Sequence, residues 1–326
     1  MTPLAVSYFL FLLIITGLVV VIGRAIERKI DSNLQKSSRL LVIVPQGLIN
    51  PFREHRPSEI ALSQELYRRL GEFNISFTLE VEVYGVGEEI QFFITVALHN
   101  KKRVVRLIET LWPTVSVEEI DGYENWHSGT DGSTLTIGYL QQRKPYSMPI
   151  EVAHRGHYEP FSHTLRQLSR LTPLGEGAAL QWVVRPANPG IAEDINELLR
   201  QLGAGHYHIS RHLHETFVIT PENLKLIKQK VAQPLFIITA RVAAASDHLN
   251  RANAIVHALA KTLEGRSSDQ LNQLALQEIK QSDRTIDAFL SRSFEPAHSI
   301  ILSAEELATV FHFPGPTTPI PKIRRH

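Results

Sequence analysis

"FTLEVEVYGVGEEIQFFITVALHNKKRVVRLIETLWPTVSVEEID", residues 77–121, contains two runs in which apolar and polar residues alternate, separated by the turn YGVGEE. Alternation with a period of two places the apolar side chains of a strand on one face. The runs therefore predict a long antiparallel hairpin over residues 75–98. Its ten alternating apolar residues are Ile75, Phe77, Leu79, Val81, Val83, Ile90, Phe92, Ile94, Val96 and Leu98.

Elements on either side of the hairpin complete a recognisable unit. Helical spacing of apolar residues from position 101 predicts a helix that Pro113 ends, and TVSVEEI (114–120) predicts a strand. Upstream, RLLVIVP (39–45) predicts a buried strand and PSEIALSQELYRRLG (57–71) predicts a helix. The order βαββαβ is that of the ferredoxin-like split unit.

The same order recurs later in the chain. Alternation predicts strands at 135–139, 179–186 and 234–244, and helical spacing predicts helices at 161–168 and 246–263. We expect SIILS (299–303) to be the last strand, after a helical detour over residues 263–297. An insertion at 188–233 should contain helices near 191–202 and 221–232.

These elements predict an α+β protein with two tandem ferredoxin-like (βαββαβ) units, the second with a helical insertion. The expected organisation has four parts, which are a transmembrane anchor (1–29), a first unit (39–122), a second unit (130–303), and a docking helix with a proline-rich tail (304–326).

Residues 4–23, LAVSYFLFLLIITGLVVVIG, carry no charge and are long enough to cross a bilayer as a helix. A cleaved signal peptide would have a basic segment before the apolar stretch, and none is present. Five basic residues and two acidic ones lie between Arg24 and Arg39. Because basic flanks stay in the cytoplasm, we expect a single-pass protein of the cell membrane with its N-terminus outside and its bulk cytoplasmic.

Composition excludes several function classes. The 34 basic and 33 acidic residues nearly cancel, so direct nucleic-acid binding is not expected, and the absence of cysteine excludes thiolate chemistry. No phosphate-binding loop, dinucleotide fingerprint, nucleophile elbow or HExxH motif occurs. We therefore predict no catalytic residue and no cofactor, and we leave oligomerisation open.

The C-terminal segment combines a capped helix with a proline-rich connector. Ser303 and Glu306 have the spacing of a capping box. Leu307, Val310 and Phe311 share one helical face, which we expect to pack on the second unit. Four prolines between positions 314 and 321 predict an extended tail without intramolecular pairing, in which Lys322, Arg324 and Arg325 supply charge for a docking partner. The alternative is a frayed terminus.

Two clusters suggest ligands weakly. His206, His208, His212 and His214 lie within nine residues, and imidazole pairs at strand spacing suit zinc, copper or nickel, although a solvated loop explains them as well. Lys101, Lys102 and Arg103 begin a predicted helix, where cations oppose the helix dipole and could hold phosphate, or could simply be solvated.

Three stretches carry a family resemblance. LSAEELATVFHFPGPTTPIPKI (302–323), residues 77–121 and PFSHTLRQLSRLTPLGEGAALQWVVRPAN (160–188) resemble the N-terminal membrane-anchored domain of unknown function found in type IV secretion or conjugative DNA transfer ATPase-like proteins of candidate-phyla bacteria. In that family the proline connector commonly leads into a RecA-like ATPase. The present sequence stops at that point, so no Walker residue of the family is assigned here.

The resemblance implies a non-enzymatic, membrane-anchored cytoplasmic module that serves a separately encoded ATPase. A membrane-tethered interaction scaffold or sensor unrelated to secretion is the alternative, since ferredoxin-like pairs are widely used for protein contacts. A metal-dependent enzyme that uses the His206 to His214 cluster is a third possibility.

Overall fold

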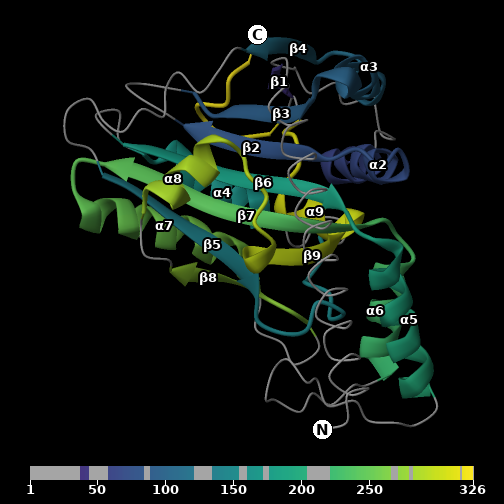
Figure 1. The fold of residues 1–326 in the computed structure, drawn as a ribbon. Coiled ribbons are helices and arrows are strands. Elements are labelled where there is room, and N and C mark those ends of the chain that lie inside the picture. The colour runs from purple at the N-terminus through teal and green to yellow at the C-terminus, as the bar shows by residue number, and fades with distance from the viewer. Residues whose placement is uncertain are drawn as a thin grey trace, which may run out of the picture.

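The structure is a computed structural model that describes residues 37–43, 58–83, 89–120, 134–153, 160–171, 176–203, 221–265, 271–278, 282–315 and 318–325. It is an α+β protein built on one antiparallel sheet (Figure 1). The strands are β1 (Ser37–Ile43), β2 (Phe77–Val83), β3 (Gln91–Ala97), β4 (Ser116–Ile120), β5 (Thr134–Gln142), β6 (Gly177–Pro186), β7 (Leu235–Ser246), β8 (Leu274–Glu278) and β9 (Ser299–Ser303).

Helices connect the strands. They are α2 (Glu59–Glu72), α3 (Lys101–Leu111), α4 (Pro160–Ser169), α5 (Pro189–Gly203), α6 (Pro221–Val231), α7 (Leu249–Leu263), α8 (Asp283–Leu290) and α9 (Ala304–Val310), with short 3₁₀ turns η1 (Leu98–Asn100) and η2 (Pro296–His298). The two helices that the sequence predicts in the insertion are α5 and α6.

The first half of the sheet has the order β4-β1-β3-β2. Its hairpin of β2 and β3 forms as predicted, with Phe77 opposite Val96 and Val81 opposite Phe92. Nine of the ten alternating apolar residues are buried in the main core. The exception is Leu98, which lies in η1 after the strand ends and is exposed.

The second half has the order β6-β7-β5-β8 and joins the first through the antiparallel pair β2–β6, in which Leu79 faces Trp182. If the strands of each half are numbered from one to four along the chain, both halves have the spatial order 4-1-3-2. The two halves meet at the second strand of each, β2 and β6.

Ser299–Ser303 is the last strand, as predicted, but it does not take the fourth place in the second half of the sheet. β8, within the stretch expected to be helical, pairs with β5, whereas β9 pairs with the beginning of β7. The physical reason is the length of β7, since Thr239 and earlier residues extend beyond β5 and leave an edge that β9 fills. LALQE is too short to distinguish strand from helix by periodicity.

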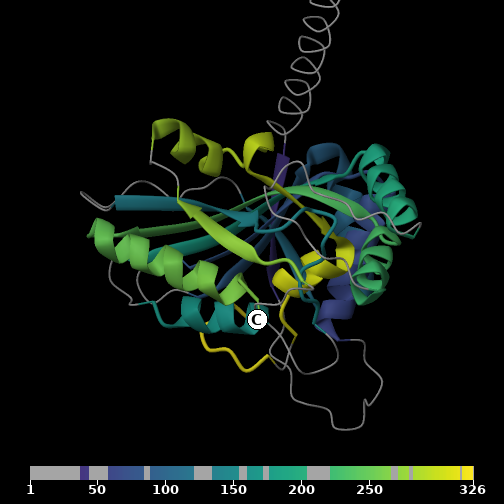
Figure 2. The ribbon, with the colours of Figure 1, turned by 90° about the horizontal axis from the view of Figure 1, so that it is seen from below.

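Helices cover the two faces of the sheet unequally (Figure 2). Side chains of α2, α3, α4, α7 and α9 pack with one face in the main core. On the other face, Phe289 of α8 packs against Ile137, Tyr139 and Ala243. The α5–α6 pair forms a separate small core with Leu235 and Met148.

Strand register distinguishes the two ends of the sheet. β1 begins where β3 stops, since Ser37 pairs with Ala97. We call this the entry end, because the chain enters the sheet there. We call the opposite end, where β3 begins at Gln91, the far end.

The predicted membrane span, residues 4–23, lies outside the described residues. Within the described ranges, every helix is too short or too polar to cross a bilayer. The basic flank of the predicted span loses one member, because Arg39 is buried in β1, where its guanidinium lies 2.9 Å from Glu82.

Candidate functional site

Helix α9 begins with the predicted capping box. The Ser303 hydroxyl accepts a hydrogen bond from the Glu306 amide at 3.3 Å, and the Glu306 carboxylate accepts one from the Ser303 amide at 2.7 Å. These bonds satisfy amides of the first turn that have no partner within the helix. The box fixes the direction in which the chain leaves β9.

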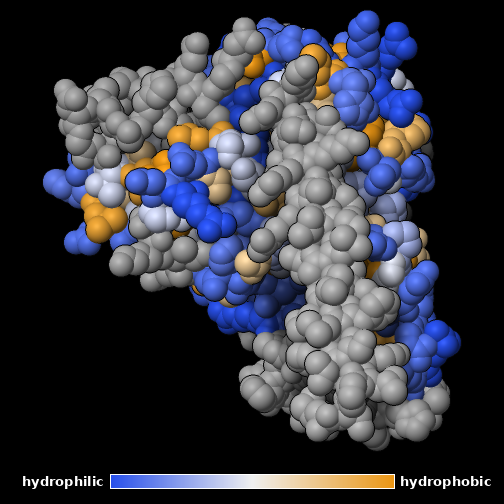
Figure 3. Space-filling view, in the orientation of Figure 1, coloured by the Kyte–Doolittle hydropathy of each residue, from blue (hydrophilic) through white to orange (hydrophobic). Residues whose placement is uncertain are grey.

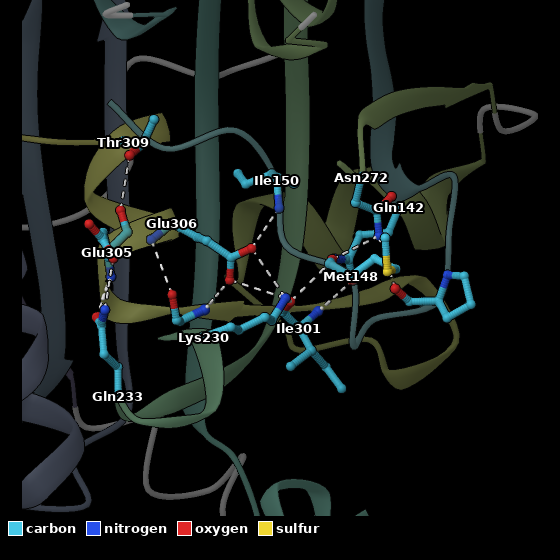
Figure 4. Close-up of polar contacts among 12 residues, drawn as sticks. Gln142, Met148, Ile150, Lys230, Gln233, Asn272, Ile301, Glu305, Glu306 and Thr309 are labelled. Atoms are coloured by element: carbon cyan, nitrogen blue, oxygen red, sulfur yellow. Dashed lines mark hydrogen bonds and ion pairs between the residues drawn. The ribbon is translucent and has the colours of Figure 1, made fainter. Parts of the chain in front are cut away.

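Glu306 has a second role that its spacing does not predict. Lys230 of α6 lies with its Nζ 3.1 Å from the Glu306 carboxylate and donates to the Ile301 carbonyl at 2.9 Å (Figure 4). The Ile150 amide donates to the same carboxylate at 2.7 Å. Both charged side chains are only 1% exposed. The ion pair therefore joins the inserted helices, β9 and α9 in the interior.

The electrostatics of this pair follow from its burial. Loss of water lowers the pKa of the Lys230 ammonium, and the charge and hydrogen bond of Glu306 act in the opposite direction. Removing one partner of such a pair leaves an uncompensated buried charge, which is costly. The pair thus makes the position of α9 depend on α6.

Polar side chains around the pair extend this connection. Gln233 bonds the Glu305 amide at 3.1 Å and receives a bond from Gln64 of α2 at 3.2 Å. Gln142 of β5 accepts from the Ile301 amide at 3.0 Å. Asn272 donates to the carbonyls of Lys144, Pro145 and Met148, which shapes the loop that leads to Ile150 (Figure 4).

The apolar face of α9 is buried inside the protein. Leu307, Val310 and Phe311, which the sequence offers for docking, all belong to the main core. The expected packing on the second unit is only part of the arrangement, because the Tyr67 hydroxyl of α2 also donates to the Phe311 carbonyl at 3.1 Å. Phe311 also contacts Phe92 of β3 and Phe161 of α4. Helix α9 therefore joins both halves of the molecule.

The tail after α9 is not unpaired, which corrects the prediction. Ile323 forms a parallel bridge with Ile90, and the Arg324 amide donates to the Ile90 carbonyl at 3.0 Å. Ile320 and Ile323 are buried. Prolines exclude a helix here but leave an extended backbone that can pair with an adjacent strand.

The basic residues of the tail are also partly engaged. Lys322 donates to the Leu171 carbonyl at 3.1 Å, and Arg325 donates to the carbonyls of Gly315 and Thr318 at 3.3 and 2.9 Å. Arg324 contributes its backbone, and its side chain is partly exposed. The tail thus lies at the far end of the sheet, beside Ile90.

Sequence reasoning missed a second polar cluster, which lies on the face of the sheet that α8 covers. One row of cross-strand neighbours crosses eight strands: Glu118, Leu41, Phe93, Glu80, Gln181, Arg241, Tyr139 and Gln277. Its centre, where β2 meets β6, is polar and buried.

Hydrogen bonds run along the centre of this row. Gln181 donates to Glu80 at 2.9 Å and accepts from Arg241 at 2.7 Å. Arg241 also lies 2.8 Å from Glu295, to which the Tyr139 hydroxyl donates. Burial alone raises the pKa of Glu295, but the bonds from Arg241 and Tyr139 outweigh burial and leave the pKa below its ordinary value. The row connects the two halves by charge as well as by backbone.

The only sequence signal for this cluster is the presence of glutamates and arginines inside strands. Alternation alone assigns Glu80 and Arg241 to a solvated face, because antiparallel sheets commonly have one such face. Burial of both faces near the middle of the sheet cannot be read from one strand.

These clusters could act on a substrate only if a substrate could reach them. An open hollow of about 560 Å³ is lined by Pro221, Leu224, Lys225, Lys228, Gln229 and Ala232, and a smaller one of about 80 Å³ lies between α4 and α7. Neither hollow includes Lys230, Glu306, Tyr139 or Glu295. The buried charges therefore hold elements together and do not face a substrate in either hollow.

The two other groups of residues that the sequence suggests for binding, the histidine cluster and the basic turn, have separate outcomes. His206, His208, His212 and His214 lie outside the described residues. Among the residues that the structure describes, no three His, Cys, Asp or Glu side chains converge as metal ligands. Of the basic turn, Lys101 pairs with Glu119, and the Arg103 guanidinium lies 4.9 Å from the centre of the Phe73 ring.

Comparisons with known proteins bear on the family alone. Residues 62–325 match the family described as "Domain of unknown function (DUF8128)". No curated protein matches the chain. Among solved structures, the ligand-free regulatory subunit of aspartate kinase from Thermus thermophilus is 10% identical, with a TM-score of 0.16, over 70% of this chain and 94% of that one. A likeness of that size carries no argument about function.

Proposed function

Because the chain belongs to the DUF8128 family of domains of unknown function, its role must be inferred from its own residues, and we propose that it is a non-enzymatic, membrane-anchored module that works with a transfer ATPase. Residues 4–23 would anchor it, and the sheet with its helices would lie on the cytoplasmic side.

One observation carries this proposal, which is the separation of the two ends of the sheet. The chain enters the sheet at Ser37 at the entry end, and the tail pairs with Ile90 at the far end. A strand of seven residues spans about 23 Å. The module would therefore hold the tail at a set distance from the membrane.

The buried clusters support a rigid connector between these ends. The Lys230–Glu306 pair fixes α9, and the row around Arg241 fixes the joint between β6 and β7. Buried charged pairs restrict alternative arrangements because separating them exposes each charge to an apolar interior. Such a body suits the positioning of a partner better than catalysis.

We also propose that each half of the sheet is a ferredoxin-like unit. The strand orders β4-β1-β3-β2 and β8-β5-β7-β6 are equivalent, and each half has the element order βαββαβ. The edge-to-edge junction at β2 and β6 would make the pair one platform. A ferredoxin-like fold does not identify the partner. The proposal of an ATPase partner rests on the tail and on the family that the sequence resembles.

Photo-crosslinking in the native bacterium tests the proposal. A photoreactive amino acid at Arg324, at the far end, should capture an ATPase that carries a Walker motif. The same amino acid at Leu98, which is exposed at the entry end, serves as the control and should not capture it. Capture of other proteins but no ATPase from Arg324 would favour the second candidate, an interaction scaffold unrelated to secretion.

A further inference from the structure

Exposed apolar side chains are few on the described surface. Phe73, Leu98 and Leu249 are the large ones, with 46%, 53% and 50% of their surface exposed. Scattered single apolar residues need no explanation, but two of these three lie close to the same end of the sheet. Phe73 follows α2 just before β2 begins, and Leu98 follows directly where β3 stops.

Exposed cations lie at the same end, on α3, which begins three residues after Leu98. Lys102, Arg103 and Arg106 of α3 are exposed, and the Arg103 guanidinium lies over the Phe73 ring. Figure 3 shows strongly hydrophilic side chains beside apolar ones at the upper right, over α2 and α3. We name Phe73, Leu98, Lys102, Arg103 and Arg106 the entry-end patch.

Helix stability does not account for these cations. The first turn of α3 contains no acidic residue, and its N-cap makes no side-chain hydrogen bond. Positive charges at a helix N-terminus oppose the helix dipole and cost stability. Lys101 is compensated by Glu119, whereas the neighbouring glutamates of α2, Glu65 and Glu72, are paired with arginines of their own helix.

The position of the patch points to its occupant. β1 begins at the same end, and residues 24–36 alone separate Ser37 from the predicted membrane span. Fully extended, these residues reach at most about 45 Å, and Arg24, Arg28, Lys29 and Lys36 make them basic. The patch is therefore tethered near a lipid surface.

We propose that the entry-end patch rests on an anionic membrane surface, with Phe73 and Leu98 inserted among the headgroups and the three α3 cations against lipid phosphates. This inference rests on the proposed membrane anchoring. Apolar and basic side chains together are the combination that binds anionic interfaces, and each basic residue near such a surface strengthens binding by about fivefold. The contact would orient the sheet so that the far end points away from the bilayer.

The absence of cysteine from the chain makes a direct test simple. Single-cysteine variants Leu98→Cys and Leu249→Cys of the full chain receive an environment-sensitive fluorophore. Each is reconstituted in phosphatidylcholine vesicles with and without phosphatidylglycerol, with brominated lipids as the quencher. We expect quenching at position 98 in the anionic vesicles, weaker quenching in the neutral ones, and none at position 249.

A variant with three charge reversals distinguishes binding by the patch from an effect of the net charge of the protein. Lys102→Glu, Arg103→Glu and Arg106→Glu together should lower the ratio of docked to undocked protein by about a hundredfold. The same change at three exposed arginines elsewhere, Arg166, Arg170 and Arg284, should leave quenching at position 98 unchanged. Equal loss of quenching by both triples would overturn the proposal.

Flotation distinguishes the two levels of inference. Stable flotation with neutral vesicles but no quenching at position 98 in either vesicle type would overturn the patch contact and leave the anchoring intact. Failure to float at all would overturn the anchoring and the patch with it. A fluorescence change at position 98 that needs no vesicles and increases with protein concentration would assign the patch to contact between copies of the chain.

Discussion

At the scale of single residues, the buried charges carry much of the specificity of this fold. Lys230 and Glu306 lie 76 residues apart in sequence, and each side chain is only 1% exposed. Arg241 is buried in the centre of the sheet and bonds Gln181 and Glu295. These contacts decide how the elements meet, which apolar packing alone leaves less defined.

Lys230→Met should destabilise the protein strongly. Methionine keeps the length of the side chain but leaves the Glu306 carboxylate buried without its counter-charge, which should cost about 3 kcal/mol. Chemical denaturation of the detergent-solubilised chain measures the effect. Lys225→Met, on the same helix in the open hollow, is the matched control and should change stability little. Equal stability of the two variants would show that the buried pair contributes nothing.

The lowered pKa of Glu295 gives the stability a pH dependence. A carboxyl whose pKa is lower in the folded than in the unfolded state contributes stability above its unfolded value, here about 4.5, and loses it as pH falls through the folded value. The difference in unfolding free energy between the wild type and Glu295→Gln should thus narrow below that pH. Glu109→Gln, on the exposed side of α3, is the control. A difference that stays constant down to pH 3 would contradict this assignment.

At the scale of elements, the sequence predicted what local patterns determine. The hairpin of β2 and β3 was predictable because its alternation is long, and the capping box of α9 was predictable because Ser303 and Glu306 have a defined spacing. The pairing of β8 with β5 and of β9 with β7 was not predictable, because it depends on the edge that β7 leaves beyond β5. The pairing of the tail with Ile90 was missed for a similar reason. Prolines indicate that the backbone is extended, but they do not indicate which strand lies beside it.

Phe92→Asp should prevent folding of the first half. Phe92 contacts Phe161, Phe311 and Phe313 in the core, so the variant loses this packing and buries a charge without a partner, at a cost above about 4 kcal/mol. Leu98→Asp continues the same alternation but lies on the surface, which makes it the matched control for the thermal melt. A wild-type melting temperature for Phe92→Asp would refute the strand register.

The tail should protect the start of β3 from exchange. Ile323→Asp removes an apolar anchor of the tail, so the amide of Ile90, which donates to the Lys322 carbonyl, should exchange faster by about tenfold or more. Arg324→Ala keeps the backbone bonds and should leave that amide protected. Hydrogen exchange read by mass spectrometry distinguishes these outcomes, and unchanged protection in Ile323→Asp would mean that the tail does not hold this strand.

At the scale of the whole molecule, the two halves share one sheet that separates the place where the chain enters from the place where the tail leaves. The entry end contains Ser37 and the patch around Phe73 and Leu98, and the far end contains Ile90 with Ile323. Helix α9 connects the two through the core, since its N-terminus is fixed by Lys230 and its last residues pack under α2. The proposed module is thus a spacer between a membrane and a partner.

Energy transfer to the bilayer tests this orientation most directly. Donor fluorophores on Leu98→Cys and Arg324→Cys variants of the full chain, in nanodiscs with acceptor-labelled lipids on the headgroup, report how near each end of the sheet is to the membrane. The account predicts strong transfer from position 98 and clearly weaker transfer from position 324. Equal transfer from the two positions, or stronger transfer from position 324, would contradict it.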